Sequence, residues 1–541
     1  MSEARLGVMS RSANMSVRRA TGAVGLLLMA SAITACGSGD DDGATAGACG
    51  PTSELRFGVH TEVRGFDVVN GGTVGVAGGH ERSAVFDTLM EYDAGTGDFV
   101  PRMAESFEPN EDYTEWTLTL RDGITFNSGN PVTTEAVKFS VDRHGADDTV
   151  SLFKAQMDVI ESMEVTSDLE MSFRLKDAQG DFPAVFATAP GMLADPAVFE
   201  EAGPEEFGVD PSAGAAGPYK VASYTQGEEV VLTRNEDYWG EGEFCIGTLR
   251  FVYVEDEEAR RDSFLNGELD MAYFNDASVI DAVRRAPREM HTSIGWGAAT
   301  VLINHGTGGV DRPGKDVRVR KAIAHALDPE VIDDRATGGT GVPSTALVTD
   351  ESILWSEGLE GPAHDPAEAS SLLAQAKADG YDGKITLSCD NAPAKVEWAL
   401  TVEAMLEKIG FDVTLENSRS LTDHRELFFT GNYDLSCFAM SVDESLPWVT
   451  FQTTLGQDTV AQSRVGYRSP AMGRAMDELR AAGTVEERQA ALFEMQAIWN
   501  EDVPMAITAH GRQGLAWNEG VEGVQFRHAG ISLFDDATID R

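Results

Sequence analysis

The sequence predicts an α/β protein with more than one domain, and three observations lead to this prediction. The chain has 541 residues, which on length alone is enough for about two or three domains. Between Asp365 and Ser436, helical and strand patterns alternate, as is typical of a parallel sheet with right-handed crossovers. Between Ser83 and Val141, a helical pattern gives way to alternating apolar and polar residues, which indicates a separate region that contains a hairpin.

The hairpin prediction depends on a short turn. Residues Trp116–Leu120 alternate apolar and polar side chains, and Ile124–Phe126 resumes the alternation after Asp122-Gly123. Asp-Gly between two such runs favours a type I′ turn, which needs positive φ at both central residues. We therefore expect these two runs to pair with each other. A second hairpin is expected within Glu161–Leu175.

The β/α region is predicted element by element from its apolar spacing. A strand around Lys384–Ser388 precedes a helix that ends at Gly410, where a left-handed C-cap belongs. Phe411–Leu415 is a second strand and Tyr433–Ser436 begins a third. A sheet order of 2-1-3 would make the first and third strands neighbours.

The N-terminus has the features of a secretory signal. Arg18-Arg19 precedes the apolar run Ala23–Ile33, which is shorter than the roughly 20 residues a membrane span needs. The run ends at Cys36 in a sequence that resembles the lipobox of bacterial lipoproteins. This predicts a signal peptide over residues 1–35 and a lipidated, flexible tether over residues 36–53, with ordinary secretion and a free Cys36 as the alternative.

Charge and motifs exclude several classes of function. Acidic residues outnumber basic ones by 89 to 42, a net charge of −47, which argues against nucleic-acid binding. The simplest interpretation is a strongly solvated surface, and the alternative is a cleft that favours cations. No metalloprotease, phosphate-loop or hydrolase motif is present, and the ten His residues include no i, i+4 pair. We expect no enzyme activity, no cofactor and no dedicated metal site.

Several segments resemble one family closely. The segments that carry the resemblance are Phe86–Leu89, Pro101–Phe107, Leu120–Phe126, Gly129–Pro131, Val137–Ser140, Gly217–Gly240, Arg261–Tyr273 and Asp316–Leu327. Together they resemble the extracellular solute-binding proteins of ABC importers, in the family that includes oligopeptide, dipeptide and nickel binders. Phe107 stands where the family usually has Trp, and Val68 where it usually has Pro.

This resemblance implies a two-lobed periplasmic-binding-protein-like fold of type II, in the large peptide-binder variant with an extra hairpin-containing subdomain. Lobe I would comprise residues 54–303 and 510–541, and lobe II residues 304–509. The implied function is capture of a solute, most simply a peptide or related amine-bearing compound, for an ABC importer, by a monomer that is lipid-anchored at the cell surface or in the periplasm. Its permease subunits would be the protein partners. A non-peptide solute such as a metal chelate or sugar, a ligand-sensing lipoprotein and a chaperone are the alternatives.

The expected ligand site lies beyond the third strand of the β/α region, because ligands bind outside the carboxyl ends of strands in open α/β sheets. Asp443 is placed like the family's Asp that pairs with the α-ammonium group of a peptide, although it could instead cap a local turn. Met440, Ser441, Glu62 and Asn304 complete the set expected to contact the ligand.

The cysteines predict two bridges. Besides Cys36 there are four, which allow three connectivities in an oxidising compartment. Cys389 and Cys437 end strands that the order 2-1-3 makes neighbours, so we expect a Cys389–Cys437 disulfide, which leaves Cys49–Cys245. Four buried thiols are the alternative.

Overall fold

All residues described in the computed structural model belong to the compact unit Gly47–Arg541. Cys36, Cys49 and the predicted signal peptide lie outside the described residues. None of the described helices has both the length and the apolar character that a membrane span requires. The structure describes residues 50–70, 75–240, 244–295, 299–307, 310–419, 424, 426–427, 430–440, 442–456, 465–526 and 531–540.

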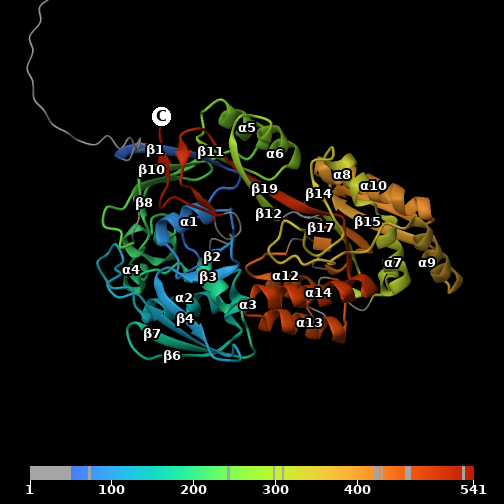
Figure 1. The fold of residues 1–541 in the computed structure, drawn as a ribbon, viewed down its shortest axis with the longest axis horizontal. Helices are drawn as coiled ribbons and strands as arrows, with labels where there is room; N and C mark the ends of the chain where they lie inside the picture. Colours follow the sequence, from blue (N-terminus) through green and yellow to red (C-terminus); the bar gives the residue numbers. More distant parts are fainter. Residues whose placement is uncertain are drawn as a thin grey trace, which may run out of the picture. The chain divides into compact units, whose positions relative to one another are not determined.

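The largest sheet has the order β12-β19-β11-β1-β10-β9-β8, with β14 paired to β19 (Figure 1). β1 lies in its middle because Leu55, Phe57 and Val59 are all buried, and it runs parallel to both β10 and β11. The strands are β1 (Gly50–Val59), β8 (Tyr219–Thr225), β9 (Glu229–Arg234), β10 (Ile246–Tyr253), β11 (Met271–Phe274), β12 (Glu289–Gly295), β14 (Val342–Pro343) and β19 (Ala509–Trp517).

A four-stranded antiparallel sheet contains the strands for which the sequence predicted two hairpins. Its order is β4 (Ala104–Pro109), β5 (Glu115–Leu120), β7 (Glu170–Leu175) and β6 (Ile160–Val165). The expected β6–β7 hairpin is confirmed. The prediction of a hairpin across Asp122-Gly123 is wrong, because β4 and β7 pair with the two edges of β5. Gly123 does adopt a positive φ of 84°, but the chain then makes only an isolated bridge between Thr125 and Pro131.

The β/α region forms a second, five-stranded sheet of order β16-β15-β17-β13-β18. The predicted order 2-1-3 is confirmed for the strands β15, β16 and β17, and both pairs formed by β15 are parallel. Helices α7, α9 and α10 accompany this sheet, as Figure 1 shows. The strands are β13 (Ala299–Ile303), β15 (Lys384–Asp390), β16 (Asp412–Arg419), β17 (Leu435–Ala439) and β18 (Met505–Ile507).

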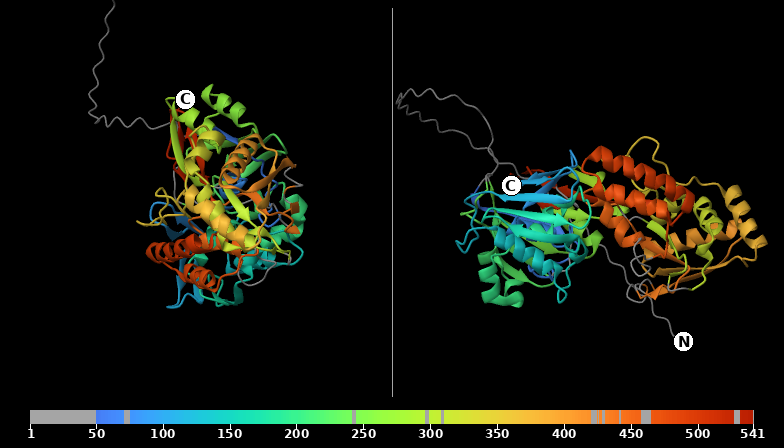
Figure 2. Two further views of the ribbon diagram at one scale, coloured as in Figure 1. Left: turned by 90° about the vertical axis from the view of Figure 1, so that its right-hand side faces the viewer. Right: turned by 90° about the horizontal axis from the view of Figure 1, so that it is seen from below.

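Helices fill the remaining space around these sheets. α13 and α14 lie side by side in every view (Figures 1 and 2). Those helices with at least eight residues are α1 (Gly79–Phe86), α2 (Thr134–Gly145), α4 (Pro196–Phe207), α5 (Glu257–Leu265), α6 (Ala277–Arg284), α7 (Val317–Ala326), α8 (Pro329–Ala336), α9 (Pro366–Ala378), α10 (Pro393–Ile409), α12 (Pro447–Leu455), α13 (Pro470–Ala481) and α14 (Val485–Asp502).

Shorter elements complete the described chain. Two of them, α3 and η2, border the cavity described below. They are β2 (Met90–Asp93), β3 (Asp98–Pro101), α3 (Lys154–Met157), η1 (Phe182–Ala187), η2 (Ala189–Gly191), η3 (Ser212–Gly214), η5 (Pro313–Lys315), β20 (Val521–Glu522), β21 (Gln525–Phe526), β22 (Ser532–Leu533) and β23 (Thr538–Ile539).

Two antiparallel connections join the large sheet to the second sheet. One leads from β12 to β13 and the other from β18 to β19, and both β12–β19 and β13–β18 are hydrogen-bonded pairs. Between these pairs, the Thr508 backbone N–H donates to the carbonyl oxygen of Ala299 at 2.9 Å. Strand membership groups β13 with the second sheet and β19 with the large one. The lobe boundaries at residues 303 and 509 stay a prediction.

The cysteines differ from the prediction at one pair. Cys389 and Cys437 are buried free thiols, so the expected disulfide between them is absent. Their strands are neighbours as predicted, and the Cys389 thiol hydrogen-bonds the Cys437 sulfur, which lowers the pKa of Cys437 and raises that of Cys389. Cys245 is disulfide-bonded. Its predicted partner, Cys49, lies outside the described residues, so the Cys49–Cys245 pairing stays a prediction.

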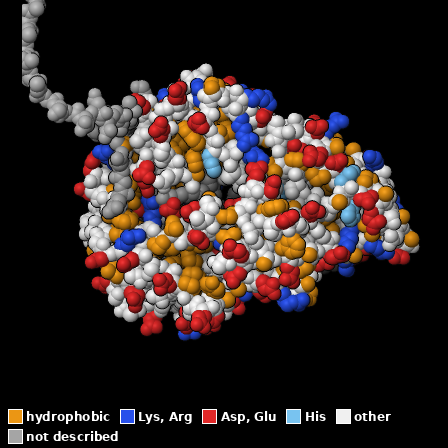
Figure 3. All heavy atoms as spheres, viewed as in Figure 1, with side chains coloured by type: hydrophobic (Ala, Val, Ile, Leu, Met, Phe, Trp, Pro, Cys, Tyr) orange, Lys and Arg blue, Asp and Glu red, His pale blue; other side chains and the backbone are white. Residues whose placement is uncertain are grey.

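The net charge of −47 comes from acidic side chains, and their distribution on the surface bears on ligand selection. Acidic side chains are spread over the visible face in Figure 3 rather than gathered in one patch. A spread of this kind keeps a protein soluble but does not by itself select a ligand. Ligand selection therefore has to be sought in the cavity.

Candidate ligand-binding site

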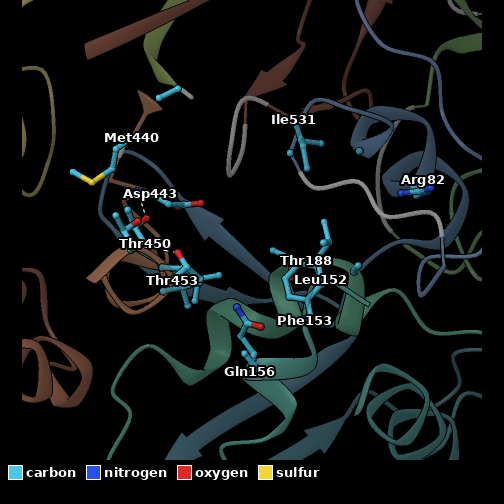
Figure 4. A pocket seen from close by; sticks show the side chains of 18 of the residues that line it. Arg82, Leu152, Phe153, Gln156, Thr188, Met440, Asp443, Thr450, Thr453 and Ile531 are labelled. Carbon is cyan, nitrogen blue, oxygen red and sulfur yellow. Dashed lines mark hydrogen bonds between the residues drawn. The ribbon is translucent and has the colours of Figure 1, made fainter. Parts of the chain in front are cut away.

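A cavity of about 260 Å³ lies where segments from distant parts of the chain meet (Figure 4). One side is formed by the end of β17, the loop after it and helix α12. The other side is formed by α1, the segment around α3, η2 and the chain near Ile531. The cavity therefore collects residues from both sheet-bearing parts of the compact unit. Such convergence is typical of small-molecule sites.

Most of the wall is apolar. Side chains of Leu152, Phe153 and Met192 face the cavity from one side, and those of Phe438 and Met440 face it from the other. The residues Phe153, Met192 and Met440 are buried, so the apolar wall is continuous with the protein core. This wall would favour a ligand that carries an apolar group, because binding removes apolar surface from water.

Asp443 is the acidic side chain that lines this cavity among the described residues. Its Oδ1 accepts hydrogen bonds from the backbone N–H and the hydroxyl of Ser445, at 3.0 and 2.8 Å. Its backbone N–H donates to Thr450 Oγ1 at 3.4 Å. The Asp443 carboxylate is thus oriented by the start of α12 while it lines the cavity. The turn cap and the ligand contact, which the sequence left as alternatives, are compatible here.

Hydroxyl and amide groups accompany this carboxylate. Thr450, Thr453 and Thr454 lie on α12, and Gln156 and Thr188 lie across the cavity from them (Figure 4). These groups can donate or accept hydrogen bonds according to the ligand. They provide the small number of polar contacts that orient a ligand in an apolar pocket.

Arg82 is the basic residue at the cavity wall among the described residues, and it is almost fully buried. Its Nε and Nη2 both donate to the carbonyl oxygen of Gly65, at 3.1 and 2.6 Å. Burial lowers the pKa of Arg82 to about 10, and burial likewise raises that of the neighbouring Glu81 to about 7. Arg82 therefore holds the loop that contains Gly65 against α1.

A buried arginine contacts the backbone of Glu444, the residue after Asp443. The Arg488 side chain on α14 is 2% exposed and donates to the carbonyl oxygens of Gly97 and Glu444, at 2.8 and 3.4 Å. Arg488 is also close enough to Asp181 to lower the pKa of that carboxyl, although burial raises it to about 7. These contacts tie α14 to the β2–β3 turn and to the loop that carries Asp443.

Among the residues predicted from sequence, Met440 and Asp443 line the cavity, and Ser441 lies outside the described residues. Glu62 instead borders a separate, very small pocket of about 10 Å³ beside Tyr224 and Tyr253. The structure therefore does not bring Glu62 together with Asp443.

Asn304 has a different position from the one expected. Its side chain is fully buried, and its Nδ2 donates to the carbonyl oxygens of Gly431 and Tyr433, both at 2.9 Å. Its Oδ1 accepts from the backbone N–H groups of Gly306 and Thr307, both at 2.8 Å. These bonds occupy the amide in holding two loops together, and Asn304 does not line the cavity.

Comparison with known proteins places this architecture in a family. The description "Bacterial extracellular solute-binding proteins, family 5 Middle" matches residues 98–462, which is most of the chain. The chain belongs to this family. It is 26% identical over 360 residues to the nickel-binding periplasmic protein of Escherichia coli strain K12, which covers 62% of this chain and 66% of that protein.

A second relative covers more of the chain. The probable D,D-dipeptide-binding periplasmic protein DdpA of Escherichia coli strain K12 is 22% identical over 472 residues, 84% of this chain and 88% of that protein. Among solved structures, NikA from Brucella suis in complex with Fe(III)-EDTA has a TM-score of 0.74 at 21% identity, over 90% of this chain and all of that one. This likeness confirms the predicted periplasmic-binding-protein-like fold.

Proposed function

We propose that this family member captures a small solute with a cationic amino group and an apolar part, and delivers it to an ABC importer. The observation that carries the proposal is an oriented carboxylate, Asp443, in a largely apolar cavity. A charge-assisted bond between an ammonium group and this carboxylate would contribute about 1.5–3 kcal/mol. Relatives whose names describe dipeptide and oligopeptide binding support a peptide or a related amine as the solute.

The cavity size supports a short ligand. Its volume of about 260 Å³ is near the lower end of the roughly 300–1,000 Å³ typical of small-molecule sites. A dipeptide-sized solute suits this volume better than a long peptide. Movement about the two connections between the sheets would open and close the cavity, as in other two-lobed binding proteins.

The rest of the proposed function concerns location and partners. The lipobox-like sequence before Cys36 supports a lipid-anchored protein outside the cytoplasmic membrane, released from its signal peptide. The solute would pass from this anchored monomer to the permease subunits of the importer. The family and the absence of any catalytic motif in the sequence support a binding role rather than an enzymatic one.

The test begins with the solute that co-purifies, identified by native mass spectrometry. Calorimetry with dipeptides and their N-acetylated counterparts then asks whether the ammonium group matters. Asp443→Asn should weaken binding of the free amines at least tenfold, or about 1.4 kcal/mol. The Asn side chain can still accept the bonds from Ser445, so the turn should persist.

Two controls make the result specific. Asp443→Asn should leave the weak binding of N-acetylated ligands unchanged, because these lack the cation. Glu62→Gln, at the separate pocket, should bind all ligands like the wild type. Equal affinity of wild type and Asp443→Asn for a free amine would exclude Asp443 from recognition.

A further inference from the structure

Three metal-ligating side chains, those of Asp390, His424 and Cys437, converge at the carboxyl ends of β15 and β17, and Cys389 accompanies them. Cys389 and Asp390 are the last two residues of β15. Ser388 pairs with Ser436 between these parallel strands, so Cys437 follows at the same level as Cys389. His424 comes from the segment between β16 and β17. We call these four residues the β15–β17 cluster.

The cluster is enclosed by protein. The exposed fractions are 0% for Cys389, 3% for Asp390, 2% for His424 and 5% for Cys437. Acidic residues on a surface often gather without a ligand, but buried carboxylate, imidazole and thiol groups are costly unless they are bonded. Burial therefore separates this cluster from the scattered surface acids.

The donor atoms are close enough to share one ion. One donor atom each from Asp390, His424 and Cys437 lies within 4.8 Å of the others. His424 Nε2 is 3.9 Å from Cys437 Sγ. Tetrahedral zinc with bonds of about 2.3 Å to sulfur and 2.0 Å to nitrogen sets these two atoms about 3.5 Å apart. A small contraction would bring these two atoms to that separation.

We propose that this cluster binds one divalent transition metal ion of the zinc type through three side chains: Asp390, His424 and Cys437. A thiolate and an imidazole are ligands that zinc favours, whereas calcium and magnesium favour oxygen ligands. All three side chains are buried, so the ion would be enclosed by protein. The site is separate from the solute cavity and does not depend on the proposed function.

Lys395 holds the carboxylate of the cluster. One thiolate and one carboxylate carry the two negative charges that a divalent ion neutralises. The Lys395 ammonium group donates to Asp390 Oδ2 at 2.6 Å and so orients that carboxylate. An outer group that bonds a ligating carboxylate in this way typically changes metal affinity about 10–100-fold when it is removed.

The site would act on the solute cavity through β17. Cys437 is followed directly by Phe438 and Ala439, which line the cavity. An ion that joins β17 to β15 and to His424 would fix the strand end that carries this wall. Zinc should therefore raise thermal stability, since an ion bound only by the folded state shifts the unfolding equilibrium.

The experiment uses the purified protein, reduced, stripped with EDTA and kept free of oxygen. We expect it to bind one equivalent of Co²⁺ with a thiolate-to-metal charge-transfer band, and Zn²⁺ should displace the Co²⁺ and raise the melting temperature. Cys437→Ser should lower zinc affinity at least 100-fold. Lys395→Met should lower it about tenfold.

His325→Gln is the matched control, because His325 lies outside the cluster and bonds the carbonyl oxygen of Ala363. It should bind zinc like the wild type. The Co²⁺ spectrum of the wild type tests the proposal even if a cysteine variant fails to fold. Absence of Co²⁺ and Zn²⁺ binding by the reduced wild type would overturn the proposal, as would unchanged zinc affinity in a folded Cys437→Ser. A Cys389–Cys437 disulfide without zinc, in protein isolated without reductant, would also overturn it.

Discussion

Asp181 offers a test of how burial shapes stability beside the cavity. Its carboxyl is 2% exposed at the start of η1, and burial raises its pKa from 3.8 to about 7. The positive charge of Arg488 opposes this rise, and the negative charge of Asp443 adds to it. Asp181→Asn replaces a titrating group with a neutral one of the same shape.

The sign follows from proton binding. Between pH 4 and 7 the unfolded chain has lost the Asp181 proton while the folded protein keeps it, so this group makes stability fall as pH rises. From pH 5 to pH 8 the loss amounts to about 2.5 kcal/mol, since one pKa unit corresponds to about 1.4 kcal/mol. Asp181→Asn lacks this loss. The variant should therefore gain about 2.5 kcal/mol relative to the wild type between pH 5 and pH 8.

Urea unfolding at pH 5 and pH 8 measures this difference, because other groups titrate in both proteins and cancel. Glu105→Gln, which removes an exposed carboxyl, should show the pH profile of the wild type. If the free-energy difference between Asp181→Asn and the wild type is the same at both pH values, the Asp181 carboxyl does not hold its proton in the folded state.

Three further predictions concern the contacts around the cavity and the anchor. Gly180→Ala should weaken solute binding by about tenfold, or 1.4 kcal/mol. A Cβ at Gly180 would lie 2.3 Å from the carbonyl oxygen of Ala482 and would keep the segments around these two residues apart. Unchanged affinity in calorimetry would show that this contact is not needed for binding. Arg488→Met should lower the free energy of unfolding, measured by urea unfolding, by about 2–4 kcal/mol, because the carbonyl oxygen of Gly97 loses its buried donor. A smaller loss would mean that water replaces that donor. Cys36→Ala should move the protein from the membrane to the soluble fraction on cell fractionation, and retention at the membrane would contradict the lipid anchor.

Local patterns predicted the second sheet well. The apolar residues of β15, β16 and β17 have the spacing typical of strands, and right-handed crossovers leave few possible strand orders in the sheet. The turn at Gly123 was also recognised, but the pairing of β5 depends on β7, more than fifty residues later in the chain. A strand pattern shows which face is buried and does not show which strand is its neighbour.

Only part of the candidate site was predicted, because local patterns locate only the residues that follow a strand end. Met440 and Asp443 follow a strand end directly, so the rule for open α/β sheets located them. Arg82 and Leu152 reach the cavity from segments whose position depends on the whole fold, and no local signal marks them. Asn304 also follows a strand, but the nearby loops take all of its bonds, which only the folded structure reveals.

The course of the chain through its two connections has a consequence for the order of assembly. In the large sheet, β11 and β12 do not pair with each other, and each borders β19 instead. Because β19 comprises Ala509–Trp517, a nascent or translocating chain must be nearly complete before these two strands gain that neighbour. All strands of the second sheet precede β19 in the chain, so that sheet can assemble first. Until β19 arrives, β11 presents an open strand edge, which leaves the early part of the chain vulnerable to pairing with other chains.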